Sequence, residues 1–345
     1  MRKVLVIDNN EIRKKKETIK MAKVKNFKTI FPAVSVPFND DYSINESEFR
    51  AYLRWIKTFY GKGMDGLVCN GHTGEITGLT RAERKRVVEI CAEECGDVMT
   101  IISGVNCENT AESIEMAKEA KEAGADGILL MPPHMWLRFG MNPDAPFEYV
   151  KDVAEGADID IIIHLYPATS KAFYPVETLI KMCKEIDHVK CIKMGTRVTS
   201  IYEHDVRLLR QECQDISLIT CHDETLCVSW FPGMDGALIG FAGCVPEIIC
   251  PAREVFANPD KHTLKEAQDW SDRIYHISQA IYGGGQPSGE AHARLKEALK
   301  QRGIFSSALM RKPVLPLNQE EKDWVALGLE RSQLPEVDMA QFEDK

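Results

Sequence analysis

The sequence lacks three features, and each absence argues against a class of protein. It has no Cys-x-x-Cys pair, so a structural zinc knuckle is not expected. Its 43 Lys and Arg residues are outnumbered by 52 Asp and Glu, a net charge of −9 that argues against a nucleic-acid-binding surface. A charge-poor stretch over residues 225–246 is cut by a Pro-Gly-Met-Asp-Gly turn, so we expect no membrane partner.

The cysteines point to a reducing environment. There are eleven in 345 residues, too few for a disulfide scaffold, and Cys69, Cys191 and Cys244 lie in apolar runs. We therefore expect buried, reduced thiols and a cytoplasmic location. The first apolar stretch, residues 4–7, ends at Asp8, which is too short for a signal peptide.

The remaining composition is that of a folded globular protein. Hydrophobic residues make up 44% and charged residues 28%, which excludes wholesale disorder. A chain of 345 residues suits two domains, or one large α/β barrel with additions.

An internal repeat, Gly-x-Asp-Gly followed by aliphatic residues, occurs at 63–68, 124–129 and 233–238. It is typical of a junction where a helix ends at glycine and a strand begins. Eight short apolar runs have strand length, and most are separated by a helical pattern. The runs are residues 29–36, 66–69, 98–103, 127–131, 160–165, 189–193, 216–221 and 236–241. This pattern predicts the α/β class and a (β/α)8 TIM barrel with a C-terminal helical extension.

A doubly wound open sheet is the alternative. It would normally carry a glycine-rich phosphate loop after its first strand, and residues 34–38 (Val-Ser-Val-Pro-Phe) have none, which favours the barrel. We expect an N-terminal extension over residues 1–26, the catalytic barrel over 27–249, a C-terminal helical subdomain over 250–317, and a last helix with an acidic tail over 318–345.

Reactive groups in such barrels follow the carboxyl ends of the strands. The loop after the second run reads Asn-Gly-His-Thr-Gly-Glu, so Gly71, His72, Thr73 and Gly74 are candidates to bind a substrate carboxylate through amides and a hydroxyl. An ordinary glycine-rich turn is the alternative.

The sixth run ends in Lys193. Because strand side chains alternate, Lys193 shares a face with Val189 and Cys191, and points into the barrel mouth if Ile192 faces the helices. A buried ammonium has a lowered pKa, and the free amine can attack a ketone to form an imine. The alternative is a lysine that bends out to solvent.

These residues carry a family resemblance. Residues 71–75 resemble the GTTGE loop, and residues 191–193 the strand-six lysine, of the dihydrodipicolinate synthase and N-acetylneuraminate lyase family of pyruvate aldolases. Further similarity lies at residues 104–106, 124–127, 236–240 and 311–316. The resemblance implies a barrel with C-terminal helices, usually a homotetramer, that needs no metal or other cofactor. It also implies Lys193 as the Schiff-base residue, Thr73 and its loop as the pyruvate-carboxylate site, and Gly240 and Phe241 in substrate binding.

Three positions depart from the family pattern. His164 stands where the family has the proton-relay tyrosine, and His72 stands at the first threonine of GTTGE. Thr169 occupies the place of the arginine that binds the second substrate in the synthases. The usual threonine–tyrosine relay is therefore absent.

The hydratase-aldolase branch that cleaves aromatic benzylidenepyruvates is more similar. It shares a Met-Trp pair (Met135 and Trp136), the spacing of two prolines, and a histidine followed by acidic residues (residues 222–224). Tyr166 departs from that branch. Trp136 is thus a candidate platform for an aromatic partner, with simple packing as the alternative.

Proton transfer needs a group that titrates near neutral pH. His222 is the first candidate, and His164 and Tyr166 follow, with a buried core histidine as the alternative for His164. We predict a Schiff-base-forming lyase, an aldolase or hydratase-aldolase, that acts on small pyruvate-derived 2-oxo acids and is a homo-oligomer.

Several alternatives remain open. The same imine chemistry would serve a dihydrodipicolinate synthase-like condensation or a sugar-acid dehydratase. The lost relay suits a catalytically silent barrel that binds keto acids. A metal-dependent lyase or hydrolase has little support, because no HxH or HExxH spacing occurs.

Overall fold

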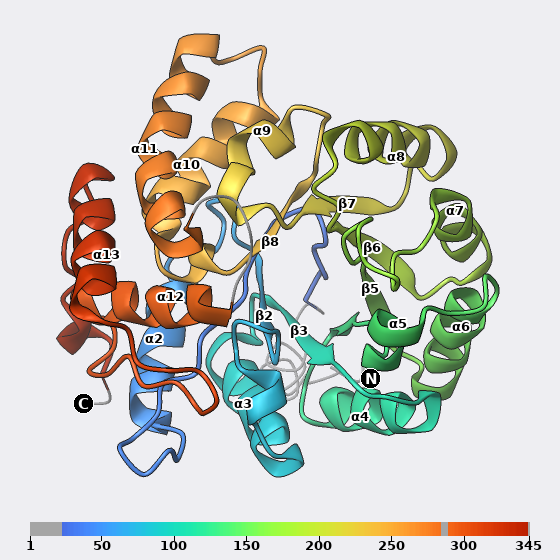
Figure 1. Ribbon diagram of the computed structural model, residues 1–345, viewed down its shortest axis with the longest axis horizontal. Helices are drawn as coiled ribbons and strands as arrows, with labels where there is room; N and C mark the ends of the chain where they lie inside the picture. Colours follow the sequence, from blue (N-terminus) through green and yellow to red (C-terminus); the bar gives the residue numbers. More distant parts are fainter. Residues whose placement is uncertain (1–22, 284–288, 344–345) are drawn as a thin grey trace, which may run out of the picture.

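The computed structural model describes residues 23–283 and 289–343, and its centre is a sheet of eight parallel strands (Figure 1). The strands are β1 (Ile30–Pro32), β2 (Gly66–Cys69), β3 (Thr100–Val105), β4 (Gly127–Leu130), β5 (Asp160–His164), β6 (Val189–Met194), β7 (Ser217–Thr220) and β8 (Gly236–Ile239). Their order is β1-β8-β7-β6-β5-β4-β3-β2. A bridge between Ala33 and Val68, with a hydrogen bond of 2.9 Å from Val34 N to Val68 O, joins the two ends. The sheet thus closes into the predicted (β/α)8 barrel.

Helices surround the barrel, as the sequence spacing predicts. They are α2 (Glu46–Lys57), α3 (Arg81–Cys95), α4 (Thr110–Glu122), α5 (His134–Phe139), α6 (Ala145–Ala157), α7 (Val176–Glu185), α8 (Thr199–Glu212), α9 (Leu226–Trp230) and α10 (Pro246–Ala257). The C-terminal helices α11 (Leu264–Tyr282), α12 (Gly289–Gln301) and α13 (Gln319–Arg331) lie together on one side (Figure 1). Because strands are covered on both faces, whole strands such as β3 are buried. The described residues also form short 3-10 helices. They are η1 (Ile76–Gly78), η2 (Asp223–Thr225), η3 (Phe241–Gly243) and η4 (Met339–Gln341).

The Gly-x-Asp-Gly repeat is a junction before three strands. Its first glycines, Gly63, Gly124 and Gly233, all have left-handed backbone angles, with φ of 96°, 104° and 89°. Glycine is favoured there because it has no Cβ to strain the turn. The aspartate then anchors the neighbouring strand: Asp126 Oδ2 accepts a hydrogen bond of 2.7 Å from Ile101 N.

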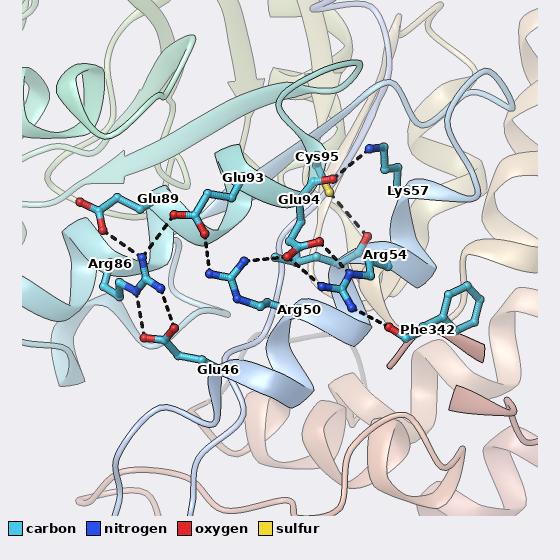
Figure 2. A network of polar contacts seen from close by, with 11 residues as sticks. Glu46, Arg50, Arg54, Lys57, Arg86, Glu89, Glu93, Glu94, Cys95 and Phe342 are labelled. Atoms are coloured by element: carbon cyan, nitrogen blue, oxygen red, sulfur yellow. Dashed lines mark hydrogen bonds and ion pairs between the residues drawn. The ribbon is translucent and has the colours of Figure 1, made fainter. Parts of the chain in front are cut away.

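An ion-pair network joins the two helices that follow β1 and β2 (Figure 2). On α3, the Glu94 carboxylate accepts hydrogen bonds from Arg50 (2.6 Å) and Arg54 (2.8 Å) of α2. Arg54 also donates to the Phe342 carbonyl at 3.0 Å, so the C-terminal segment is tied to α2. Because these ion pairs are partly exposed, we expect each to contribute little to the free energy of folding. They link α2 to α3.

Other findings bear on the sequence predictions. The domain boundary predicted at residue 249 falls inside α10, because that helix covers the last strand as the eighth barrel helix. Residues 1–22 of the predicted extension, and 344–345 of the acidic tail, lie outside the described residues. All eleven cysteines are free thiols, and in the described ranges no helix is long and apolar enough to cross a membrane.

Candidate active site

The carboxyl ends of the strands open into a cavity of about 370 Å³, the Lys193 cavity. Its lining residues are Ala33, Gly71, His72, Thr73, Leu129, His134, Leu137, His164, Tyr166, Pro167, Lys193, Arg197, Cys221, Asp223, Leu238, Gly240, Tyr282 and His292. This is the end of a (β/α)8 barrel at which active sites form. The structure therefore brings together Lys193, His164, Tyr166, Gly71, His72, Thr73 and Gly240 from the predicted set.

Lys193 lies near the end of β6, directly beside His164 of β5 in the strand register. Within residues 23–283 and 289–343, the side-chain amine of Lys193 has no hydrogen bond or ion pair. Burial lowers the pKa of its ammonium, and the nearby Asp223 carboxylate opposes this effect. An unpaired lysine with a lowered pKa supplies the neutral amine that imine formation requires.

Thr73 and Gly240 lie close together in one wall of the Lys193 cavity. A Cβ on Gly240 would lie 3.1 Å from Thr73 Oγ1 and 2.6 Å from the Tyr282 hydroxyl, so only glycine allows this approach. Gly74 is not part of the lining; its N–H donates to the Gly71 carbonyl at 3.1 Å and closes the turn that presents Thr73.

Three aromatic side chains form one wall of the Lys193 cavity. The ring centroids of His164 and Tyr166 are 4.9 Å apart, and His72 lies 5.7 Å from His164 and 6.3 Å from Tyr166. The Tyr166 hydroxyl is 3.5 Å from His72 Nε2. Burial, with a smaller effect of Lys193, lowers the pKa of His72 to about 3 and that of His164 well below its usual value. Both imidazoles are therefore neutral at pH 7.

His222, the first acid–base candidate from the sequence, does not line the Lys193 cavity. It lines a neighbouring outer cavity of about 400 Å³, where its ring lies 4.7 Å from that of Tyr202. Burial lowers its pKa to about 4, and its Nε2 has no hydrogen-bond partner among the described residues. The structure thus separates His222 from Lys193.

Asp223, the next residue, faces Lys193 instead. Its Oδ1 accepts hydrogen bonds from the Tyr282 hydroxyl (2.7 Å) and from Phe241 N (3.2 Å). Burial raises the pKa of this carboxyl to about 6. The acidic pair after His222 is a signal in the sequence that points to Asp223. The sequence does not show which of these residues faces the Lys193 cavity.

Two other predicted residues lie outside the cavity lining. Trp136 packs edge-on against Tyr149 and Tyr174, with centroids 5.6 and 6.2 Å apart, and is only 8% exposed. Phe241 is fully buried against Tyr282, and its backbone amide holds Asp223. The substrate-binding roles of Trp136 and Phe241 stay predictions.

The C-terminal helices contribute to the site, which the sequence did not indicate. Tyr282 ends α11, and His292 lies on α12 with a pKa lowered to about 4 by burial. On the same helix, Lys296 forms a buried ion pair of 2.5 Å with Glu75, the last residue of the predicted carboxylate loop. These residues are far from Glu75 in the sequence, so no local pattern predicts the arrangement. It depends on how α12 packs on the barrel.

A further cation, Arg197, follows β6. Its guanidinium binds the Glu224 carboxylate through Nε and Nη2, and Nη1 donates to the Gly195 carbonyl at 3.2 Å. Arg197 lines both the Lys193 cavity and the outer cavity. Across the described part of the chain, no three His, Cys, Asp or Glu side chains are placed to hold a metal ion.

A parallel (β/α)8 barrel with a partly buried lysine at the carboxyl end of a strand defines an enzyme of the class I aldolase type, which makes or breaks carbon–carbon bonds. The particular family follows from comparison. The sequence model of the Dihydrodipicolinate synthetase family matches residues 26–331, and the chain belongs to this family.

Proteins of known name are similar to this chain in sequence, and solved structures share its fold. The 4-hydroxy-tetrahydrodipicolinate synthase of Bartonella bacilliformis is 26% identical over 304 residues, which cover 88% of this chain and 97% of that protein. The Helicobacter pylori enzyme of the same name is 26% identical over 299 residues, covering 84% and 92%. The structure of Aquifex aeolicus dihydrodipicolinate synthase superposes with a TM-score of 0.78 at 20% identity, covering 90% and 99%. The Escherichia coli protein YagE superposes with a TM-score of 0.79 at 20% identity, covering 89% and 99%.

Proposed function

We propose that this protein is a lyase that joins pyruvate to an aldehyde, or releases it from one, through an imine on Lys193. The observation that supports this proposal most directly is the position of Lys193. Its unpaired amine, with a lowered pKa, lines the same cavity as the Thr73 and Gly240 wall. In this arrangement the carboxylate of pyruvate binds near Thr73 while its ketone faces the amine.

The chemistry follows from the amine. Lys193 Nζ adds to C2 of pyruvate, and the carbinolamine loses its oxygen as water to give a protonated imine. Loss of a proton from C3 gives an enamine, whose C3 bonds to the aldehyde carbon while a proton is added to the aldehyde oxygen. Hydrolysis of the imine releases the product and the free amine, and the reverse sequence cleaves the bond.

Proton transfer is assigned to the Tyr166 and His72 pair. Both side chains line the cavity, and their polar atoms are 3.5 Å apart. In the condensation direction, His72 takes the proton that leaves C3, the Tyr166 hydroxyl gives its proton to the aldehyde oxygen, and the proton on His72 then passes to the Tyr166 oxygen. This pair of residues takes the place of the threonine–tyrosine relay, which this chain lacks. His164, beside Lys193, orients both rings.

The relatives support the pyruvate half of the proposal. YagE was crystallised in complex with pyruvate, and the curated relatives named above are synthases of the same family. An aromatic partner, a dehydration on the same imine, a homo-oligomer and a cytoplasmic location stay predictions. The position of Trp136, packed between two tyrosines, gives the aromatic partner no support.

Borohydride trapping tests the proposal. The protein is incubated with pyruvate and sodium borohydride, digested, and analysed by peptide mass spectrometry. We expect a reduced pyruvyl adduct on Lys193 that is lost in Lys193→Arg and kept in Lys190→Arg, which changes an exposed lysine of the same strand. No adduct on Lys193 would overturn the imine mechanism, and an adduct without any turnover would instead support the silent keto-acid-binding barrel.

A further inference from the structure

The outer cavity lies beside the Lys193 cavity, and the proposed reaction does not use it. Its volume of about 400 Å³ is in the range of small-molecule sites. Arg197 lines both cavities. His222 and Glu224 line the outer cavity, whereas Asp223 between them lines the Lys193 cavity. We propose that the outer cavity binds a second small molecule, an uncharged aromatic ring that carries a hydroxyl group.

A buried histidine gives this cavity an unsatisfied polar atom. His222 is 5% exposed, and its Nε2 has no hydrogen-bond partner among the described residues. Because burial lowers the pKa of the ring to about 4, the imidazole is neutral at pH 7, and Nε2 either donates or accepts. A hydroxyl group both donates and accepts, so it satisfies Nε2 in either tautomer. A ligand without a polar group would leave this nitrogen unpaired, which is costly.

The charged side chains of the lining are already paired with one another. Arg197 binds Glu224, and Arg207 pairs with Glu203 at 2.6 Å. These two pairs include every charged side chain among the described lining residues. An anion or a cation would have to compete with a partner that is already bound, so it gains less than it would at an unpaired site. An uncharged ligand leaves both ion pairs intact.

Apolar side chains form the rest of the lining and favour a ring. Val228 of α9 is 62% exposed and Phe231, just after that helix, is 65% exposed. A ring that covers these side chains removes their apolar surface from water. Tyr202 also lines the cavity, and its hydroxyl already donates to the Ser229 carbonyl at 2.9 Å. The lining therefore combines an apolar wall with few unsatisfied polar atoms, which suits an aromatic ring with one hydroxyl.

The binding of three small probes tests the proposal. We use p-cresol, toluene and p-toluate, which share a methyl-substituted ring and differ in carrying a hydroxyl group, no polar group and a carboxylate. Affinities are measured by ligand-observed NMR titration of the whole protein. We expect p-cresol to bind at least tenfold more tightly than either other probe. Saturating pyruvate should change the affinity for p-cresol less than threefold, because the two cavities are separate.

Two variants and a control assign the binding to this cavity. His222→Phe keeps a ring beside Tyr202 but removes the polar atom, so p-cresol should bind no better than toluene. Phe231→Ser removes an exposed ring and should weaken p-cresol and toluene alike, at least threefold. His204→Phe, the matched control, changes an exposed histidine of α8 outside the lining and should leave all three affinities unchanged.

Three results would overturn the inference. They are an affinity for p-cresol that both His222→Phe and Phe231→Ser retain, equal or tighter binding of toluene or p-toluate, and displacement of p-cresol by pyruvate. The inference does not rest on the imine chemistry. Absence of pyruvate trapping on Lys193 would overturn the proposed function and leave the outer site standing.

Discussion

The Tyr166 hydroxyl lies 3.5 Å from Nε2 of His72, and this contact joins the end of strand β5 to the loop after β2. His72 departs from the pattern of the family and Tyr166 from that of the hydratase-aldolase branch, and the barrel brings the two departures together. In the proposed mechanism, this pair takes the place of the threonine–tyrosine relay that the chain lacks.

The first prediction concerns this pair. Tyr166→Phe and His72→Asn should each lower kcat about 100-fold, because each removes a proton-transfer group, while borohydride trapping of pyruvate continues. The double variant should be little worse than either single variant, because the two residues act as a unit. If steady-state kinetics show that kcat of the double variant falls by the product of the two single losses, the two residues do not share one relay.

The second prediction concerns the pKa of Lys193. The Asp223 carboxylate favours the charged ammonium, so Asp223→Asn should lower the pKa of Lys193 further. A lower pKa leaves more neutral amine at a given pH, so the pH profile of pyruvate trapping should move about one unit toward acid. Asp223→Glu keeps the charge and serves as the control. A profile that moves toward higher pH would show that the carboxylate does not act on the lysine charge.

The third prediction concerns Gly240. In Gly240→Ala the new Cβ meets the Tyr282 hydroxyl at 2.6 Å and Thr73 Oγ1 at 3.1 Å, and Tyr282 is held by Asp223. We expect the pyruvate concentration for half-maximal trapping to rise at least tenfold. Gly289→Ala, where a Cβ meets nothing within 4 Å, should behave as the unmodified protein. An unchanged pyruvate response in Gly240→Ala would place the carboxylate elsewhere.

The fourth prediction concerns the buried Lys296–Glu75 pair. Lys296→Met leaves the Glu75 carboxylate without its partner, and should lower the free energy of unfolding by about 3–5 kcal/mol. Glu75→Gln/Lys296→Met removes both charges and should be less destabilised in urea unfolding. Lys265→Met, which breaks an exposed pair with Asp269, should have almost no effect. Equal losses in the single and double variants would show that the Glu75 charge is not the cause.

The fifth prediction concerns acid stability. Burial lowers the pKa of His222 from 6.5 to about 4, so the unfolded chain binds a proton there before the folded chain does. The stability that this histidine contributes is present above pH 6.5 and is lost as the pH falls toward 4. Between pH 8 and 4 the loss is about 3 kcal/mol.

The variant His222→Phe should remove this loss, since the ring still packs on Tyr202. We would compare free energies of unfolding at several pH values with those of the unmodified protein. His204→Phe, at an exposed site, should give a curve parallel to that of the unmodified protein. A His222→Phe curve with the same slope as the unmodified protein would mean that His222 titrates normally in the folded state.

Sequence reasoning could not place side chains where the chain leaves regular structure. Strand β7 ends at Thr220, and alternation of side chains stops there, so nothing local indicates that Asp223 faces Lys193 while His222 faces outward. The same reason applies to Trp136. It lies on α5, a helix of six residues whose rotation is set by contacts with Tyr149 and Tyr174.

The sequence by itself determined the barrel and its lysine. The eight strands, the repeated glycine turns and the inward direction of Lys193 depend on periodicity within short segments, which the residues carry locally. Only the tertiary structure decided which side chains share the cavity. Tyr282, His292 and Arg197 reach it because α11 and α12 pack over the barrel and Glu224 clamps the loop after β6. Such contacts join residues far apart in the chain, and no local pattern encodes them.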